Sequence, residues 1–173
     1  MWGGIYAVLF SIATITSAEN PVRNGFPKTI TQSYEKITFS KVEFQEKIVG
    51  SELQYSYYLN RKYGPVQPGY SISVTDNSGL WFGSGFIKKV KLNDKFNLNF
   101  DFFPGVYSQN NEVDLGGWLM FRSGIELEYQ LGNIWKISIA YDHRSSGDIW
   151  EYNPGLETIK FSFSRYITPS WKF

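Results

Sequence analysis

The residues with the clearest chemical potential in this sequence lie in its C-terminal third. His143 is the single histidine of the chain, Ser145 follows two positions later, and Glu157 comes after an intervening stretch rich in turn-forming residues. A serine, a histidine and a carboxylate are the parts of an acyl-transfer triad, in which the imidazole takes the hydroxyl proton and the carboxylate orients the imidazole. Because His-x-Ser alone is a short and common pattern, this chemistry requires a fold that brings Glu157 to the other two residues.

Period-two alternation around these residues predicts two neighbouring β-strands, at 135–141 and 159–167, and residues 142–147 end the first of them. His143 and Ser145 share the odd-numbered, apolar face of the first strand. If the two strands form a hairpin centred near Trp150, Glu157 lies opposite His143 and on the same face. The alternative interpretation is a polar cluster at the level of lipid headgroups, where such side chains are tolerated.

Similar alternation extends over most of the sequence after position 34 and predicts an all-β fold. The candidate strands cover residues 37–49, 53–59, 70–75, 80–91, 96–102, 119–129, 135–141 and 159–167. An even number of two-faced strands, eight here, is typical of an antiparallel transmembrane β-barrel of the bacterial outer membrane, whose closure leaves no unpaired edge. We therefore expect one barrel domain over residues 35–173.

Alternation does not say which face points inward, and a soluble lipocalin-like carrier would show the same pattern. Two features favour the membrane barrel. The polar face carries charges suited to a narrow, paired lumen, namely Arg122, Glu126, Glu128 and Lys160. Aromatic residues lie at many strand ends, as in interfacial girdles, and the terminal Trp171-Lys172-Phe173 resembles the assembly signal of outer-membrane proteins. Short turns at 92–94 and 131–133 are expected on the periplasmic side, with longer loops at 104–116 and 145–155 outside.

Composition excludes several function classes. The chain of 173 residues has a net charge of +1 and no cysteine, so disulfide scaffolds, thiolate metal sites and cysteine nucleophiles are excluded. The single histidine argues against a histidine-rich metal site, and the absence of a basic block argues against nucleic-acid binding. We expect no cofactor and no metal. The 14 Phe, 12 Tyr and 6 Trp residues need an apolar environment other than a large core.

The N-terminal residues 1–18 are uncharged and contain an apolar run before Thr16-Ser17-Ala18, which predicts a secretory signal peptide. A membrane anchor helix is the alternative, but the run is short and interrupted by polar residues. Residues 19–34 show no clear element.

The active-site stretches also resemble a known family. Residues 143–147 read His-Arg-Ser-Ser-Gly and residues 153–157 read Asn-Pro-Gly-Leu-Glu. They are similar to the signature of the lipid A 3-O-deacylase (PagL-type) family, which has His-x-Ser-Asn followed by Asn-x-Gly-x-Glu at this spacing. The resemblance implies an outer-membrane barrel with a catalytic C-terminal hairpin. It also implies that Ser145 is the nucleophile, His143 the base and Glu157 the orienting acid.

The same resemblance assigns supporting roles. Asn153 matches a family asparagine that supports the site, whereas Ser146 replaces the asparagine that donates to the oxyanion hole. The Ser146 hydroxyl and the Gly147 N–H are the expected donors here. Arg144 is the first candidate to contact a lipid phosphate, although ordinary solvation by headgroups would also explain it.

The implied function is hydrolysis of the 3-O-acyl ester of lipid A, in the outer leaflet of the bacterial outer membrane, without a cofactor. Two alternatives stay open at this point. One is a non-catalytic small barrel acting in adhesion or membrane integrity, and the other is the exported carrier. The carrier predicts a water-soluble protein, whereas either barrel requires detergent. The sequence does not indicate acyl-chain preference or oligomeric state.

Overall fold

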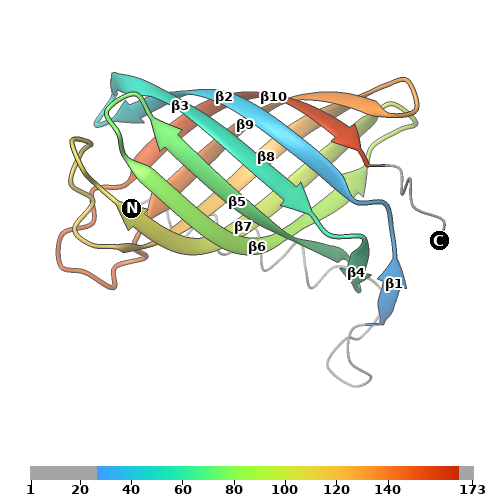
Figure 1. Ribbon diagram of the computed structural model, residues 1–173, viewed down its shortest axis with the longest axis horizontal. Coiled ribbons are helices and arrows are strands. Elements are labelled where there is room, and N and C mark those ends of the chain that lie inside the picture. Colours follow the sequence, from blue (N-terminus) through green and yellow to red (C-terminus); the bar gives the residue numbers. More distant parts are fainter. Residues whose placement is uncertain (1–26, 168–173) are drawn as a thin grey trace.

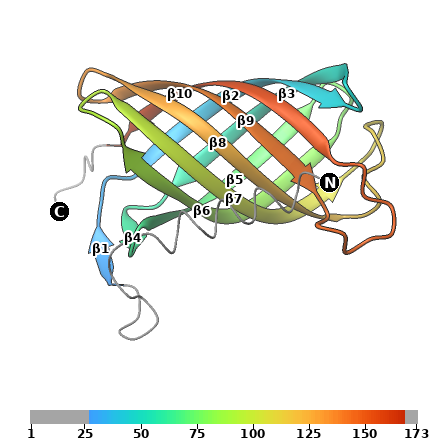
Figure 2. The same cartoon turned by 180° about the vertical axis from the view of Figure 1, so that it is seen from behind.

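In a computed structural model, which describes residues 27–167, the chain forms a closed antiparallel β-barrel (Figures 1 and 2). The barrel strands are β2 (Tyr34–Phe44), β3 (Lys47–Tyr58), β5 (Val66–Thr75), β6 (Leu80–Lys91), β7 (Phe96–Ser108), β8 (Leu119–Leu131), β9 (Trp135–Ser145) and β10 (Leu156–Tyr166). Each strand pairs with the next along the chain, and β10 pairs with β2 to close the ring. The predicted eight-stranded antiparallel barrel is therefore confirmed.

Two short strands lie beside the ring. β1 (Lys28–Ile30) pairs with β4 (Arg61–Tyr63), and both lie at the end of the barrel where β2 begins and β10 ends (Figure 1). The sequence showed no element before position 34, because a three-residue strand is too short to display alternation. The expected signal peptide and the terminal aromatic residues lie outside the described residues.

The expected strand over 37–49 is wrong at its C-terminal end. The chain reverses at Gln45 and Glu46, which both have positive φ angles, and β3 begins at Lys47. Two-residue hairpin turns of this kind usually contain glycine or asparagine, so Gln-Glu carried no turn signal.

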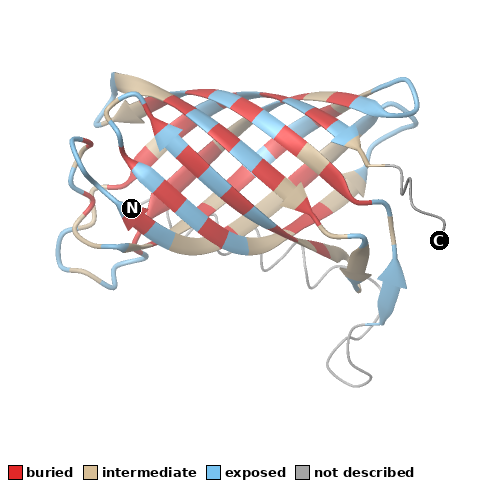
Figure 3. Ribbon diagram, in the orientation of Figure 1, coloured by how far each residue is buried: buried red, intermediate tan, exposed pale blue. Residues whose placement is uncertain are grey.

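Burial alternates along most of each barrel strand (Figure 3), although the last four residues of β9, from Asp142 to Ser145, are all buried. The outward face carries exposed apolar side chains, among them Phe39, Ile139 and Ile159. The inward face carries buried polar and charged side chains, among them Arg122 and Asp142. An apolar exterior and a polar interior suit a barrel in lipid and contradict a soluble carrier, whose apolar side chains would point inward. None of the residues from 27 to 167 forms a helix that is long and apolar enough to cross a membrane.

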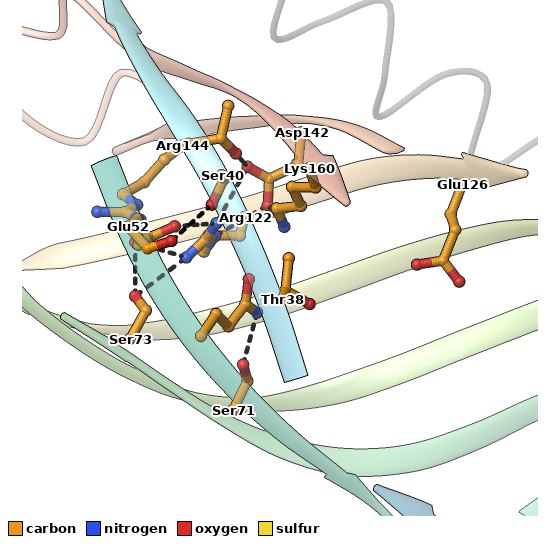
Figure 4. A network of polar contacts seen from close by, with 12 residues as sticks. Thr38, Ser40, Glu52, Ser71, Ser73, Arg122, Glu126, Asp142, Arg144 and Lys160 are labelled. Carbon is orange, nitrogen blue, oxygen red and sulfur yellow. Dashed lines mark hydrogen bonds and ion pairs between the residues drawn. The ribbon is translucent and has the colours of Figure 1, made fainter. Parts of the chain in front are cut away.

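A network of buried ion pairs fills the lumen (Figure 4). The Arg122 guanidinium on β8 reaches Glu52 on β3 and Asp142 on β9, with N–O distances of 2.9 Å to each. Lys160 on β10 also pairs with Asp142. Nearer the β1–β4 end, Lys36 pairs with Glu126, and Lys89 and Lys136 pair with Glu128. Each charge of this luminal network thus has an opposite partner, which offsets part of its desolvation cost.

The two ends of the barrel differ. One end, which we call the loop end, carries the β2–β3 and β5–β6 turns and the two longer connections 109–118 and 146–155. Buried apolar side chains close the lumen beneath these loops, namely Val42, Tyr107, Leu115, Met120 and Leu156. The opposite end has the short connections 92–95 and 132–134. The short connections agree with the sequence-based expectation, whereas the expected loop over 104–116 begins only at residue 109, because β7 continues to Ser108.

Candidate active site

The β9–β10 hairpin brings the predicted acid and base together at the loop end. In the observed register His143 pairs with Glu157, as a hairpin centred near Trp150 predicts. The Nδ1 atom of His143 lies 2.9 Å from Oε2 and 3.1 Å from Oε1 of Glu157. With Nδ1–H donating to the carboxylate, Nε2 is the ring nitrogen left to accept a proton.

Ser145 lies on the same outward face of β9, one pleat closer to the loop end than His143. Its cross-strand neighbour on β8 is Phe121, whose ring stacks on Phe102 with centroids 5.8 Å apart. Ser145 and His143 are each only 8% exposed. The candidate nucleophile is therefore largely shielded, beside an aromatic patch on the lipid-facing wall.

Gly155 is a site residue that the sequence analysis did not single out. Its φ angle is +76°, and a Cβ atom added there would lie 2.7 Å from Cε1 of His143 and 3.5 Å from Nε2. The Gly155 backbone therefore packs against the edge of the imidazole, where a larger residue would displace the ring. Its place in the Asn-Pro-Gly-Leu-Glu stretch was the only signal for this role.

The loop that follows Ser145 is held by Asn153. The Asn153 Oδ1 atom accepts a hydrogen bond from the Ser146 backbone N–H at 2.9 Å, and its Nδ2 donates to Asp148 at 2.8 Å. The Ser146 side chain is fully buried, and its hydroxyl has no hydrogen-bond partner within residues 27–167. Gly147 is exposed, with a φ angle of +63°. Asn153 thus fixes the turn that carries both expected oxyanion donors.

The loop at 109–118 packs against the loop at 146–155 from the side. A Cβ atom on Gly117 would lie 2.2 Å from Nε1 of Trp150, and one on Gly116 would lie 1.7 Å from the Tyr152 carbonyl oxygen. The absence of side chains at Gly116 and Gly117 therefore allows the two loops to pack together. Trp118 adds a ring contact with Trp150, at a centroid distance of 6.5 Å.

The structure corrects the expected phosphate contact of Arg144. This side chain is 1% exposed and points into the lumen, where its guanidinium pairs with Glu52 (Figure 4). An even-numbered residue of β9 faces away from lipid, so parity already opposed the proposed contact. Arg144 therefore belongs to the luminal network and does not lie where a lipid phosphate would bind.

Luminal residues next to the candidate site anchor β9 on its inner face. Asp142 immediately precedes His143, and it pairs with Arg122 and Lys160 and accepts a hydrogen bond from Thr158. β9 is thereby tied through its inner face to both neighbouring strands (Figure 4). The sequence analysis placed Arg122 and Lys160 on the luminal face but did not recognise them as supports of His143. Within residues 27–167, no group of three or more Asp, Glu, His or Cys side chains is placed to hold a metal ion.

Comparison with known proteins assigns the chain to a family. The sequence model of the lipid A 3-O-deacylase (PagL) family matches residues 37–165. This range includes all of β9 and all but the last residue of β10. The chain belongs to the lipid A 3-O-deacylase (PagL) family. It is accordingly an outer-membrane protein of a lipid A deacylase family. No curated protein sequence matches it significantly.

Solved structures agree with the fold of the PagL family. The crystal structure of the outer membrane enzyme PagL matches with a TM-score of 0.52 and 13% identity, covering 75% of this chain and 97% of that one. Neisserial surface protein A matches with a TM-score of 0.54 and 9% identity, covering 82% and 99%. A designed transmembrane β-barrel matches with a TM-score of 0.55 and 7% identity, covering 80% and 98%. At these identities the likeness shows the barrel fold alone.

Proposed function

We propose that the protein is a serine esterase that removes the 3-O-linked acyl chain of lipid A. The observation that carries this proposal is the His143–Glu157 pair, which lies beside Ser145 on the outward face of the barrel. A soluble substrate would not reach a site on the lipid-facing wall, whereas a lipid presents its ester bonds there. Family membership supports the same substrate.

The proposed mechanism uses only groups of this chain and water. The Ser145 hydroxyl attacks the ester carbonyl while Nε2 of His143 takes its proton, and Glu157 stabilises the imidazolium through Nδ1. Collapse of the tetrahedral intermediate transfers the proton to the departing sugar oxygen and leaves an acyl chain on Ser145. Water then attacks this acyl-enzyme with His143 again as base, releasing the fatty acid and restoring the serine. Gly147 N–H and the Ser146 hydroxyl are the proposed donors to the oxyanion.

The proposed orientation places the loop end at the cell exterior and both chain termini in the periplasm. Short connections in barrels of this kind are usually periplasmic and long ones external. Lipid A occupies the outer leaflet, so this orientation brings the ester to the level of Ser145. With the barrel reversed, the site would face inner-leaflet phospholipid.

The experiment is mass spectrometry of lipid A from cells that express the protein or its variants. Ser145→Ala and His143→Ala should each abolish loss of the acyl chain, and Glu157→Ala should reduce it less, because the acid is neither nucleophile nor base. Ser123→Ala is the matched control, since Ser123 is the outward neighbour of His143 on β8. It should keep full activity. Heat-modifiable migration in electrophoresis verifies that every variant is a folded barrel.

Two results would contradict the proposal. Full activity of the Ser145→Ala protein would reject Ser145 as nucleophile, and a further Ser146→Ala change would then show whether Ser146 replaces it. Intact lipid A in cells that contain the folded, unaltered protein would instead favour a non-catalytic barrel acting in adhesion or membrane integrity.

A further inference from the structure

Lys41 is a cation on the lipid-facing wall that forms no ion pair within the described residues. It lies on β2 and is exposed on the outward face. Its ammonium group donates instead to the Ser51 hydroxyl on β3, at 2.9 Å. The cations of the luminal network, in contrast, are paired with carboxylates. An unpaired ammonium on an apolar wall has charge available for an anionic ligand.

The strand registers place Lys41 at about the height of His143. A hydrogen-bonded row runs from Ala140 on β9 through Lys160, Ser40 and Glu52 to Thr75 on β5. Thr75 is the last residue of β5 at the loop end, whereas five more residues of β9 lie between Ala140 and that end. A row therefore comes closer to the loop end as it passes from β9 to β5.

Lys41 lies two strands from His143. Its row, which contains Tyr141 and Ile159, is two residues farther from the loop end than the row of His143. With a strand tilt of about 40°, moving two strands across from His143 raises the height along the barrel axis by about 6 Å toward the loop end. Moving back by two residues along β2 lowers it by about 5 Å. The two Cα atoms are then about 12 Å apart, nearly parallel to the membrane.

An apolar hollow of about 840 Å³ lies beside Lys41 on the outer wall. Exposed apolar side chains from β2, β3, β5, β9 and β10 line it, including Phe39, Leu53, Val74, Ile139 and Ile159. Lys41, Ser51 and Asp76 contribute polar groups to the same hollow, and the Asp76 carboxylate accepts a hydrogen bond from the Ser51 N–H. A site with one cation next to an apolar surface is complementary to an anionic headgroup that bears acyl chains.

We propose that this hollow binds lipid A during catalysis, with Lys41 contacting the phosphate on the sugar that does not carry the scissile ester. The inference rests on the proposed function and adds a specificity-determining residue to it. Lipid A is a phosphorylated disaccharide, so a phosphate on its second sugar lies at a lateral distance from the ester comparable with the separation of Lys41 and the catalytic hairpin. Acyl chains of the same lipid then cover Ile139, Ile159 and Phe39.

The test compares two lipids, lipid A with both phosphates and lipid A lacking the phosphate of the second sugar. We expect the unaltered protein to show a KM about five-fold lower for the first lipid, the value of one charge-assisted contact at a partly solvated surface. Lys41→Gln should remove this preference through KM, and Lys41→Arg should retain it. Lys47→Gln is the matched control, because Lys47 is an exposed lysine at the same rim. It should leave the preference unchanged.

A binding measurement separates this inference from the proposed function. Ser145→Ala protein in lipid nanodiscs should bind the doubly phosphorylated lipid about five-fold more tightly, and addition of Lys41→Gln should abolish the difference. If the unaltered protein hydrolyses neither lipid but this difference persists, the catalytic proposal fails and the binding site stands. Equal binding of both lipids, or equal effects of Lys41→Gln and Lys47→Gln, would overturn the role of Lys41.

Discussion

Ser146 is the residue at which this chain departs from the family pattern, and the burial of its side chain is unfavourable for stability. Its hydroxyl is fully buried without a hydrogen-bond partner in the described part of the chain, and its backbone N–H is already bound to Asn153. A buried unpaired hydroxyl typically costs about 1 to 3 kcal/mol. The proposed oxyanion would be a partner for this hydroxyl that is present only during the reaction.

We therefore expect Ser146→Ala to separate activity from stability. If the hydroxyl serves the oxyanion, kcat should fall about 100-fold, the usual cost of losing one such donor. The free energy of unfolding should stay unchanged or rise, because the unpaired group is gone. Kinetics on lipid A and urea unfolding in lipid vesicles measure the two effects. An unchanged kcat would leave Gly147 as the single proposed donor.

The hairpin is the element that brings His143 and Glu157 into contact and places Ser145 on the same face of the barrel. Its register places Glu157 opposite His143, and its loop returns so that the Gly155 backbone touches the ring. The loop thus orients the imidazole from above, while the carboxylate holds Nδ1 from the side.

Gly155→Ala should lower activity by displacing His143. Gly132→Ala is the matched control, because Gly132 also has a positive φ angle, +69°, but no atom lies within 4 Å of an added Cβ. Both changes impose about 1 to 2 kcal/mol of backbone strain, whereas only Gly155→Ala clashes with the ring. We expect kcat to fall at least 10-fold in the first variant and to stay near normal in the second, in the same lipid A assay. Similar losses in both would show that strain alone is responsible.

Elements and their pairing were predictable from the sequence where alternation was regular. In the strands around Phe96 and Trp135, regular alternation showed which residues share a face. Parity and a hairpin centre near Trp150 were then sufficient to pair His143 with Glu157. The turn at Gln45-Glu46 was not predictable, because its positive φ angles are imposed by closure of the hairpin rather than favoured by its residues. The contact of Gly155 with His143 was hidden as well, since it depends on the path of a loop without periodicity.

At the scale of the whole molecule, the lumen is a core made of charges. Arg122 bridges Glu52 on β3 and Asp142 on β9, so one side chain links opposite parts of the wall (Figure 4). The outer wall carries exposed apolar side chains, whereas the inner wall is crossed by these ion pairs. Asp142 immediately precedes His143 in β9, which makes the geometry of the site dependent on this network.

Arg122→Met tests how much the barrel depends on the network. Methionine fills similar space but leaves Glu52 and Asp142 without their shared partner, with Arg144 and Lys160 as the remaining nearby cations. Removing one member of a buried ion pair usually costs about 3 to 5 kcal/mol, so we expect a loss of about 3 kcal/mol in the free energy of unfolding, measured by urea denaturation in lipid vesicles. Arg165→Met is the matched control, because Arg165 pairs with Glu35 outside the lumen and its side chain is 50% exposed. It should cost less than about 1 kcal/mol. Equal losses in the two variants would show that the luminal charges add no more stability than a surface pair.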